Sequence, residues 1–186
     1  YDKTGNEELA RKYYFEAIEL TPEFPDPWFG LGLLALSRDR ASESIPFLEK
    51  AVQLDENNAD YWFTLGKANI MLNNFKKALK CFRKTLRIDA YFDDAWIETG
   101  LIIMMTESYK KALPFLDEVR RISGEVPGIY FLLSSCNLHL GRVRVAETFL
   151  SRAAEMDPEL CSDYSVLFPE DLVNTRMSNL INGKKK

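Results

Sequence analysis

Apolar residues recur along the chain with the spacing of amphipathic helices, and the whole pattern repeats every 34 residues. The large aromatic residue of each period occupies Trp28, Trp62, Trp96 and Tyr130. A glycine follows the first three by four residues, at Gly32, Gly66 and Gly100. Further on, the same step joins Ala78, Ala112 and Ala146, and also Leu48, Phe82, Leu116 and Leu150. Periods in one unbroken register predict copies of a single structural unit.

Each period predicts two helices joined by a tight turn. The aromatic residue, a leucine three residues on and the glycine after it share one side of the first helix, and the glycine lets the second helix approach closely. The turn is expected at Asp39, Asn73 and Gly141, residue types that tolerate a left-handed backbone. An aspartate is expected to cap the first helix at Asp26, Asp60 and Asp94. The predicted fold class is therefore all-α.

Within the second period, Trp62-x-x-Leu65-Gly66 is followed by Ala78 and Phe82. This motif resembles the tetratricopeptide repeat (TPR) family, whose 34-residue unit carries W-x2-L-G…A-x3-F. The resemblance extends over four units, 25–58, 59–92, 93–126 and 127–160. It implies helix-turn-helix repeats stacked in a right-handed superhelix.

The flanking segments are expected to differ from the four repeats. Residues 1–24 fit the second half of a truncated upstream repeat, so we expect the chain to be a fragment of a longer protein. Residues 161–186 are expected to form a C-terminal capping helix and a tail, because the apolar face of a last repeat needs a cover.

Composition narrows the class of protein. A chain with 46% hydrophobic and 28% charged residues is expected to fold, and its apolar runs are far shorter than a membrane span. A net charge of −4 gives no reason to expect nucleic acid as a partner. The three cysteines lack C-x-x-C spacing, which favours a reducing, cytoplasmic location.

Catalytic chemistry is not expected. His139 is the single histidine, so neither a histidine-rich metal site nor a Ser-His-Asp triad is predicted, and His139 itself is expected at or near the surface. Cys136 is expected in the core, and no phosphate-binding glycine loop is present. The sequence predicts no enzyme, no cofactor, no metal and no small-molecule substrate.

The TPR resemblance implies that the first helices line a concave groove for a partner peptide or helix. The groove positions lie one, five and eight residues after each large aromatic residue, and Met71 and Met105 lie beside them. They are Phe29, Leu33, Leu36, Phe63, Lys67, Ile70, Met71, Ile97, Leu101, Met104, Met105, Phe131, Ser135 and Leu138. Such an apolar row either binds a partner or packs helix against helix across repeats.

The second helix of the second repeat carries a cluster of basic residues with no acid among them. The cluster comprises Lys76, Lys77, Lys80, Arg83, Lys84 and Arg87. It is either a solvated outer face or a docking patch for an acidic protein or nucleic acid.

The function expected from these features is a non-enzymatic scaffold that binds a protein or peptide in the groove. Two alternatives stay open. In the first, the repeats are a self-association or spacer module, and self-association would make the protein a homo-oligomer. In the second, they are a regulatory segment of an enzyme whose catalytic domain is absent.

Overall fold

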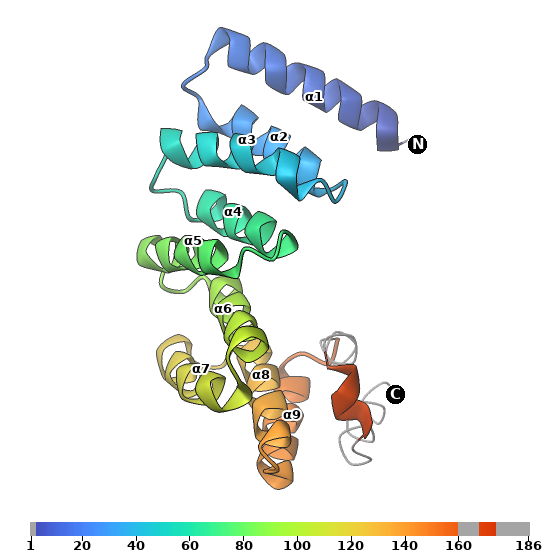
Figure 1. Cartoon of the computed structure of the whole chain (residues 1–186), viewed down its shortest axis with the longest axis vertical. Helices are drawn as coiled ribbons and strands as arrows, with labels where there is room; N and C mark the ends of the chain where they lie inside the picture. Colours follow the sequence, from blue (N-terminus) through green and yellow to red (C-terminus); the bar gives the residue numbers. More distant parts are fainter. Residues whose placement is uncertain (1–2, 160–167, 174–186) are drawn as a thin grey trace. The chain divides into compact units, whose positions relative to one another are not determined.

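The computed structural model describes residues 3–159 and 168–173, and over these residues every regular element is a helix (Figure 1). The α-helices are α1 (Lys3–Leu20), α2 (Pro25–Leu36), α3 (Ala41–Leu54), α4 (Ala59–Met71), α5 (Phe75–Ile88), α6 (Asp93–Thr106), α7 (Tyr109–Ser123), α8 (Pro127–His139) and α9 (Val143–Met156). A 3-10 helix, η1, spans Pro169–Val173. The predicted all-α fold class is confirmed.

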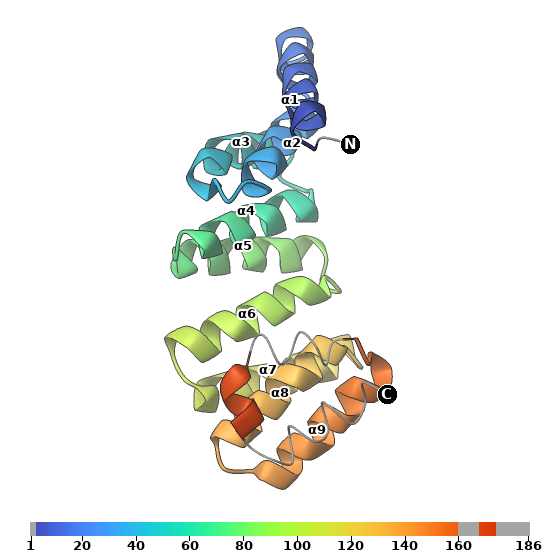
Figure 2. The ribbon, with the colours of Figure 1, turned by 90° about the vertical axis from the view of Figure 1, so that its right-hand side faces the viewer.

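The chain divides into two compact units, an N-terminal unit of residues 1–95 and a C-terminal unit of residues 96–186. In the N-terminal unit, α2 packs on α3 and α4 packs on α5, and α3 joins the two pairs by packing on α4 (Figures 1 and 2). In the C-terminal unit, α8 packs against both α7 and α9. Each unit is therefore built from consecutive helices packed side by side.

Each predicted repeat contains two of the observed helices, starting with α2 and α3 within residues 25–58. The division into four repeats with distinct flanking segments stays a prediction. Most of the predicted capping helix and tail, residues 161–167 and 174–186, lies outside the described residues.

The glycines of the first three periods lie where a side chain of the second helix packs directly on the first helix. A Cβ atom built on Gly66 would lie 2.4 Å from a ring carbon of Phe82, and one on Gly32 would lie 2.5 Å from Leu48. Phe82 and Leu48 are both fully buried. In the fourth period the glycine is replaced by Ser134, whose buried hydroxyl donates a hydrogen bond of 2.9 Å to the carbonyl oxygen of Ala146.

The turns between paired helices follow the sequence prediction. Asp39, Asn73 and Gly141 have φ angles of 56°, 57° and 75°, all in the left-handed region. An L-residue with a short polar side chain, or glycine, adopts this conformation at low cost. The predicted turn positions are confirmed.

The expected aspartate caps are wrong for the first two repeats. Helix α4 is capped by Asn58, whose side-chain oxygen accepts hydrogen bonds from the amides of Asp60 and Tyr61 at 3.0 and 3.3 Å. Asp60 instead lies in the first turn of α4, and Asp26 lies in the first turn of α2, after the cap position Phe24. A carboxylate in the first turn still stabilises the helix, because it faces the positive end of the helix dipole.

The indoles of the first two repeats pack against the core of the N-terminal unit and tie each first helix to the loop before it. Trp28 and Trp62 pack against a cluster of buried residues centred on Leu48, Tyr61 and Leu65. Trp28 Nε1 donates to the carbonyl oxygen six residues earlier at 3.0 Å, and Trp62 Nε1 does the same at 2.9 Å. The ring thus supplies apolar area while its one polar atom is satisfied.

Two thiols belong to the core. Burial is the main cause that raises the pKa of Cys81 to about 11, and the nearby carboxylate of Glu49 raises it further. Burial also raises the pKa of Cys136 to about 12, with a smaller effect from Asp171. Both cysteines are free and buried, so at neutral pH they are packing residues with their protons on.

Replacing Phe82 by alanine should lower the free energy of unfolding by about 3–5 kcal/mol, because the change removes a fully buried ring from its contact with Gly66. Urea unfolding followed by circular dichroism measures the loss. The matched control is Lys80→Ala on the exposed side of the same helix, which should change stability by less than about 0.5 kcal/mol. A loss below about 1 kcal/mol for Phe82→Ala would show that this contact does not hold the pair together.

Iodoacetamide should alkylate Cys81 and Cys136 at least about tenfold more slowly in the native protein than in urea at pH 9. Their ordinary pKa is 9.0, so the unfolded chain is half ionised at this pH, whereas burial keeps both native thiols protonated. By the same difference, folding stability should decrease as the pH rises above 9. Peptide mapping by mass spectrometry follows each cysteine separately, and equal native and denatured rates would contradict the buried placement.

Candidate functional site

The first helices of the N-terminal unit present a row of apolar side chains at the positions expected for partner binding. Leu33 on α2 and Met71 on α4 are each 43% exposed, and Lys67 is exposed between the apolar positions of α4. The half-buried members are Phe29, Leu36, Phe63 and Ile70. We refer to these seven residues as the apolar stripe.

Aromatic packing holds the base of the apolar stripe in place. The ring of Phe29 lies 4.7 Å from that of Tyr61, and the ring of Phe63 lies 5.6 Å from Phe82 and 4.8 Å from Phe92. These separations fall within the favourable range for aromatic pairs. These pairs hold Phe29 and Phe63, the two aromatic members of the stripe, against the rest of the N-terminal unit.

Tyr61 also links the helices that carry the stripe. Its hydroxyl donates a hydrogen bond to the carboxylate of Asp26 in the first turn of α2. Burial raises the pKa of Tyr61 above its ordinary value, and the hydrogen bond to Asp26 raises it further. The phenol consequently stays protonated and remains a donor throughout the physiological pH range.

In the C-terminal unit the equivalent positions are mostly covered. Met104, Phe131 and Ser135 are buried, with exposures of 7%, 5% and 0%. Their side chains pack within the chain, which matches the helix-packing alternative for these positions. The remaining four predicted positions are Ile97, Leu101 and Leu138, which are half-buried, and Met105, which is 70% exposed. A partner-binding role for any of the fourteen residues stays a prediction.

The 3-10 helix η1 lies beside α8, as the contact between Asp171 and His139 shows (Figure 2). Phe168 is 6% exposed and belongs to the same core cluster as Phe131. Asp171 of η1 is buried, and its Oδ1 lies 2.9 Å from Nε2 of His139 at the end of α8. The imidazole of His139 stacks on Tyr109 with ring centroids 3.9 Å apart, so it is fixed from two sides.

His139, Glu170 and Asp171 are the residues best placed to hold a metal ion in the described part of the chain. Their ligand atoms all lie within 4.8 Å of one another. The contact of 2.9 Å between His139 Nε2 and Asp171 Oδ1 joins η1 to the end of α8. The side chain of His139 is 28% exposed, which confirms its predicted place near the surface.

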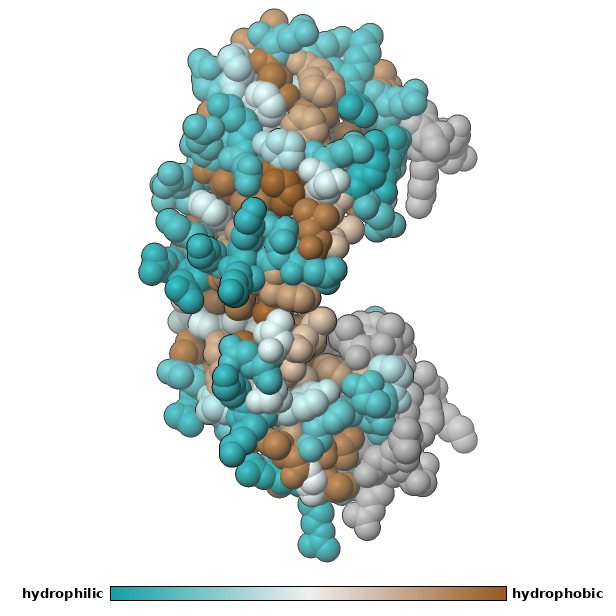
Figure 3. All heavy atoms as spheres, in the orientation of Figure 1, coloured by the Kyte–Doolittle hydropathy of each residue, from teal (hydrophilic) through white to brown (hydrophobic). Residues whose placement is uncertain are grey.

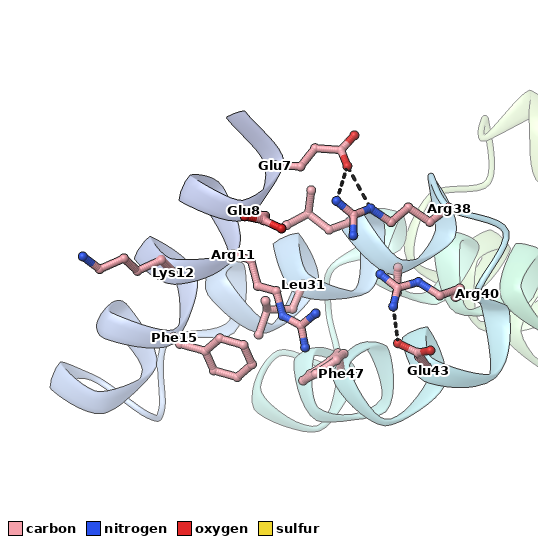
Figure 4. A pocket seen from close by; sticks show the side chains of 12 residues that line it. Glu7, Glu8, Arg11, Lys12, Phe15, Leu31, Arg38, Arg40, Glu43 and Phe47 are labelled. Atoms are coloured by element: carbon pink, nitrogen blue, oxygen red, sulfur yellow. Dashed lines mark hydrogen bonds and ion pairs between the residues drawn. The ribbon is translucent and has the colours of Figure 1, made fainter. Parts of the chain in front are cut away.

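A pocket of about 370 Å³, which the repeat pattern did not predict, lies between α1, α2 and α3 (Figure 4). Leu31, Phe15 and Phe47 supply apolar walls, and charged side chains surround them. The charges pair along the rim: Arg38 contacts Glu7 at 2.8 Å, and Arg40 contacts Glu43 at 3.0 Å. The first pair joins α1 to the turn after α2, and the second lies at the start of α3. The hydrophobic pattern of one helix alone therefore does not predict this pocket.

No helix in the described residues combines the length and the apolar character that crossing a membrane requires.

Comparison with protein families gives three matches, all described as tetratricopeptide repeat, over residues 1–59, 59–91 and 127–160. Together they cover more than half of the chain. A search of curated proteins found no significant match.

Among solved structures, the chain is similar to the crystal structure of MamA, with a TM-score of 0.73, 19% identity, and coverage of 86% of this chain and 93% of that chain. It is also similar to YrrB, described as a TPR protein with an unusual peptide-binding site, with a TM-score of 0.64, 21% identity, and coverage of 92% and 90%. A third structure, the APC/C hetero-tetramer Cut9-Hcn1, gives a TM-score of 0.75 at 12% identity, with 98% of this chain matching 36% of that chain.

The TM-scores show a shared fold, and the family matches at 59–91 and 127–160 coincide with the second and fourth periods of the sequence. The chain belongs to the tetratricopeptide repeat family.

Proposed function

We propose that the protein is an interaction scaffold that binds a segment of a partner protein along the apolar stripe of the N-terminal unit. Membership of the TPR family supports a protein-interaction scaffold, because such repeats are typical non-catalytic binding modules. The exposure of Leu33 and Met71 supports the apolar stripe as the binding surface. Large apolar side chains on neighbouring helices that stay exposed in a folded chain favour a protein interface.

The stripe also indicates the chemistry of the partner segment. Its exposed members are aliphatic or thioether side chains, which adapt to apolar side chains of uneven shape. An amphipathic segment with apolar side chains on one side fits this arrangement.

Two of the similar proteins support a protein partner by what their descriptions say. YrrB is described as having a peptide-binding site, and Cut9-Hcn1 is described as a hetero-tetramer. For this chain, a protein or peptide is the proposed partner, and neither a cofactor nor a small-molecule substrate is part of the proposal.

In the C-terminal unit, the predicted groove positions would contribute less to partner binding. Met105 and the half-buried Ile97, Leu101 and Leu138 retain surface that a partner can touch. Met104, Phe131 and Ser135 serve the core, because almost none of their surface is accessible.

Changing Leu33 and Met71 together to glutamate should weaken binding of a partner peptide at least about tenfold, because each charge would have to lose water in an apolar contact. Peptides are first selected from a displayed random library on the immobilised wild-type chain. Their dissociation constants are then measured by fluorescence polarisation for wild type and variant.

The matched control is Ser42→Glu with Gln53→Glu, which adds the same charge at exposed positions of α3. The control should bind the selected peptides as wild type does. The binding surface would lie elsewhere if both variants weakened binding equally. The same conclusion would follow if the dissociation constants did not change on substitution of Leu33 and Met71. Light scattering that shows a dimer broken by Leu33→Glu with Met71→Glu would favour self-association through the stripe.

A further inference from the structure

Helix α5 carries a concentration of positive charge that packing does not explain. Its cations are Lys76, Lys77, Lys80, Arg83, Lys84 and Arg87, and all six are exposed. The helix contains no acidic residue, although the chain as a whole has a net charge of −4. We refer to these six side chains as the basic face of α5. The figure of the molecular surface shows hydrophilic side chains gathered over this helix (Figure 3).

The basic face lies on the side of α5 away from the core. Ala78, Phe82 and Thr85 are fully buried on the other side of the helix. Within the described residues, no carboxylate forms a salt bridge with any of the six cations, and Lys84 alone has a specific contact, lying 5.6 Å from the Trp62 ring. Like charges four residues apart on a helix destabilise it, so this arrangement is a cost to folding that a bound anion would relieve.

Acidic groups follow the basic face at the C-terminal end of α5. There the charges of Asp94 and Asp89, after burial, raise the pKa of Asp93. The positive surface is therefore a strip along α5 that ends before Asp89.

We propose that the basic face of α5 is a second docking site, which binds an acidic protein segment lying along the helix. From Lys76 to Arg87 the cations follow the helix for about 16 Å, at a rise of about 1.5 Å per residue. A partner helix with carboxylates spaced three and four residues apart presents its charges in the same way. The segment would be about a dozen residues long.

The surroundings of the strip favour an acidic peptide over nucleic acid. A nucleic-acid backbone extends beyond a strip of this length and would meet the carboxylates at its C-terminal end and the net negative charge of the chain. Beside the strip, the Trp62 ring already has Lys84 5.6 Å from its centroid, which makes this ring less available for base stacking. A short helix aligned with α5 meets cations along its whole length.

The test uses the full chain and a labelled, end-blocked peptide of about a dozen residues, with glutamates at i, i+4, i+7 and i+11. An isomeric peptide with the same glutamates spread around the helix is the ligand control, and single-stranded and duplex DNA of similar length are the competing class. Fluorescence polarisation should show binding of the patterned peptide at about 50 mM salt that weakens strongly by about 200 mM.

The protein variant is Lys80→Glu with Arg83→Glu, which leaves Lys84 and its contact with Trp62 intact. It should bind the patterned peptide at least about tenfold more weakly than wild type. The matched control, Arg142→Glu with Arg144→Glu, changes the net charge equally at exposed residues of the other unit and should bind as wild type does. Circular dichroism melting confirms that both variants fold.

Three results would overturn the proposal. They are equal weakening in both variants, equal affinity for the two peptide isomers, and tighter α5-dependent binding of DNA than of peptide. This docking site is independent of the apolar stripe, so Leu33→Glu with Met71→Glu should leave patterned-peptide binding unchanged, and either proposal can fail alone.

Discussion

In the first three helix pairs a large apolar side chain of the second helix rests on a glycine of the first. Phe82 on Gly66, and Leu48 on Gly32, leave no room for even one additional carbon. This contact limits the distance between the helices and the rotation of each about its axis, because a side chain at the glycine position would push them apart. The C-terminal unit uses the same contact between Gly100 and Leu116.

That constraint also separates the surfaces of the molecule. Once the inward side of α5 is committed to the contact with Gly66, its outward side carries no packing requirement and can collect charge. The first helix α4, by contrast, packs against two neighbours, α3 and α5. What remains exposed on α2 and α4 is narrow, and this is where Leu33 and Met71 lie. The basic face and the apolar stripe are thus consequences of how each kind of helix is shared between neighbours.

The features that the sequence predicted are those that depend on the steric properties of a single residue type. The left-handed turns at Asp39 and Asn73 are of this kind, as is the glycine contact. Helix capping was predicted less well, because the side chain that reaches the first amides of α4 is Asn58 and not Asp60. Choosing between two good capping residues requires the path of the chain as it enters the helix, which a periodic pattern does not contain.

Burial at equivalent positions was the least predictable property. Phe29 and Phe131 occupy the same place in their periods, yet Phe29 is half-buried and Phe131 is 5% exposed. The core cluster that contains Phe131 includes Phe168, a residue outside the four periods. The pocket next to α1 and the contact between His139 and Asp171 also involve residues far apart in sequence. A repeat pattern describes what the copies have in common, and the site depends on where they differ.

The two proposed surfaces share the α4–α5 helix pair but rely on different forces. The apolar stripe would bind through removal of apolar area from water, which salt does not weaken, whereas the basic face would bind through charges that salt screens. A partner that carries both an apolar segment and an acidic one, joined by a linker able to pass around the helix pair, would hold the second segment at a high effective concentration. Two individually weak contacts would then give a tight complex at low salt and retain only the apolar contact at high salt. The dependence of affinity on salt, compared between a partner and its separate segments, therefore reports whether one chain uses both surfaces at once.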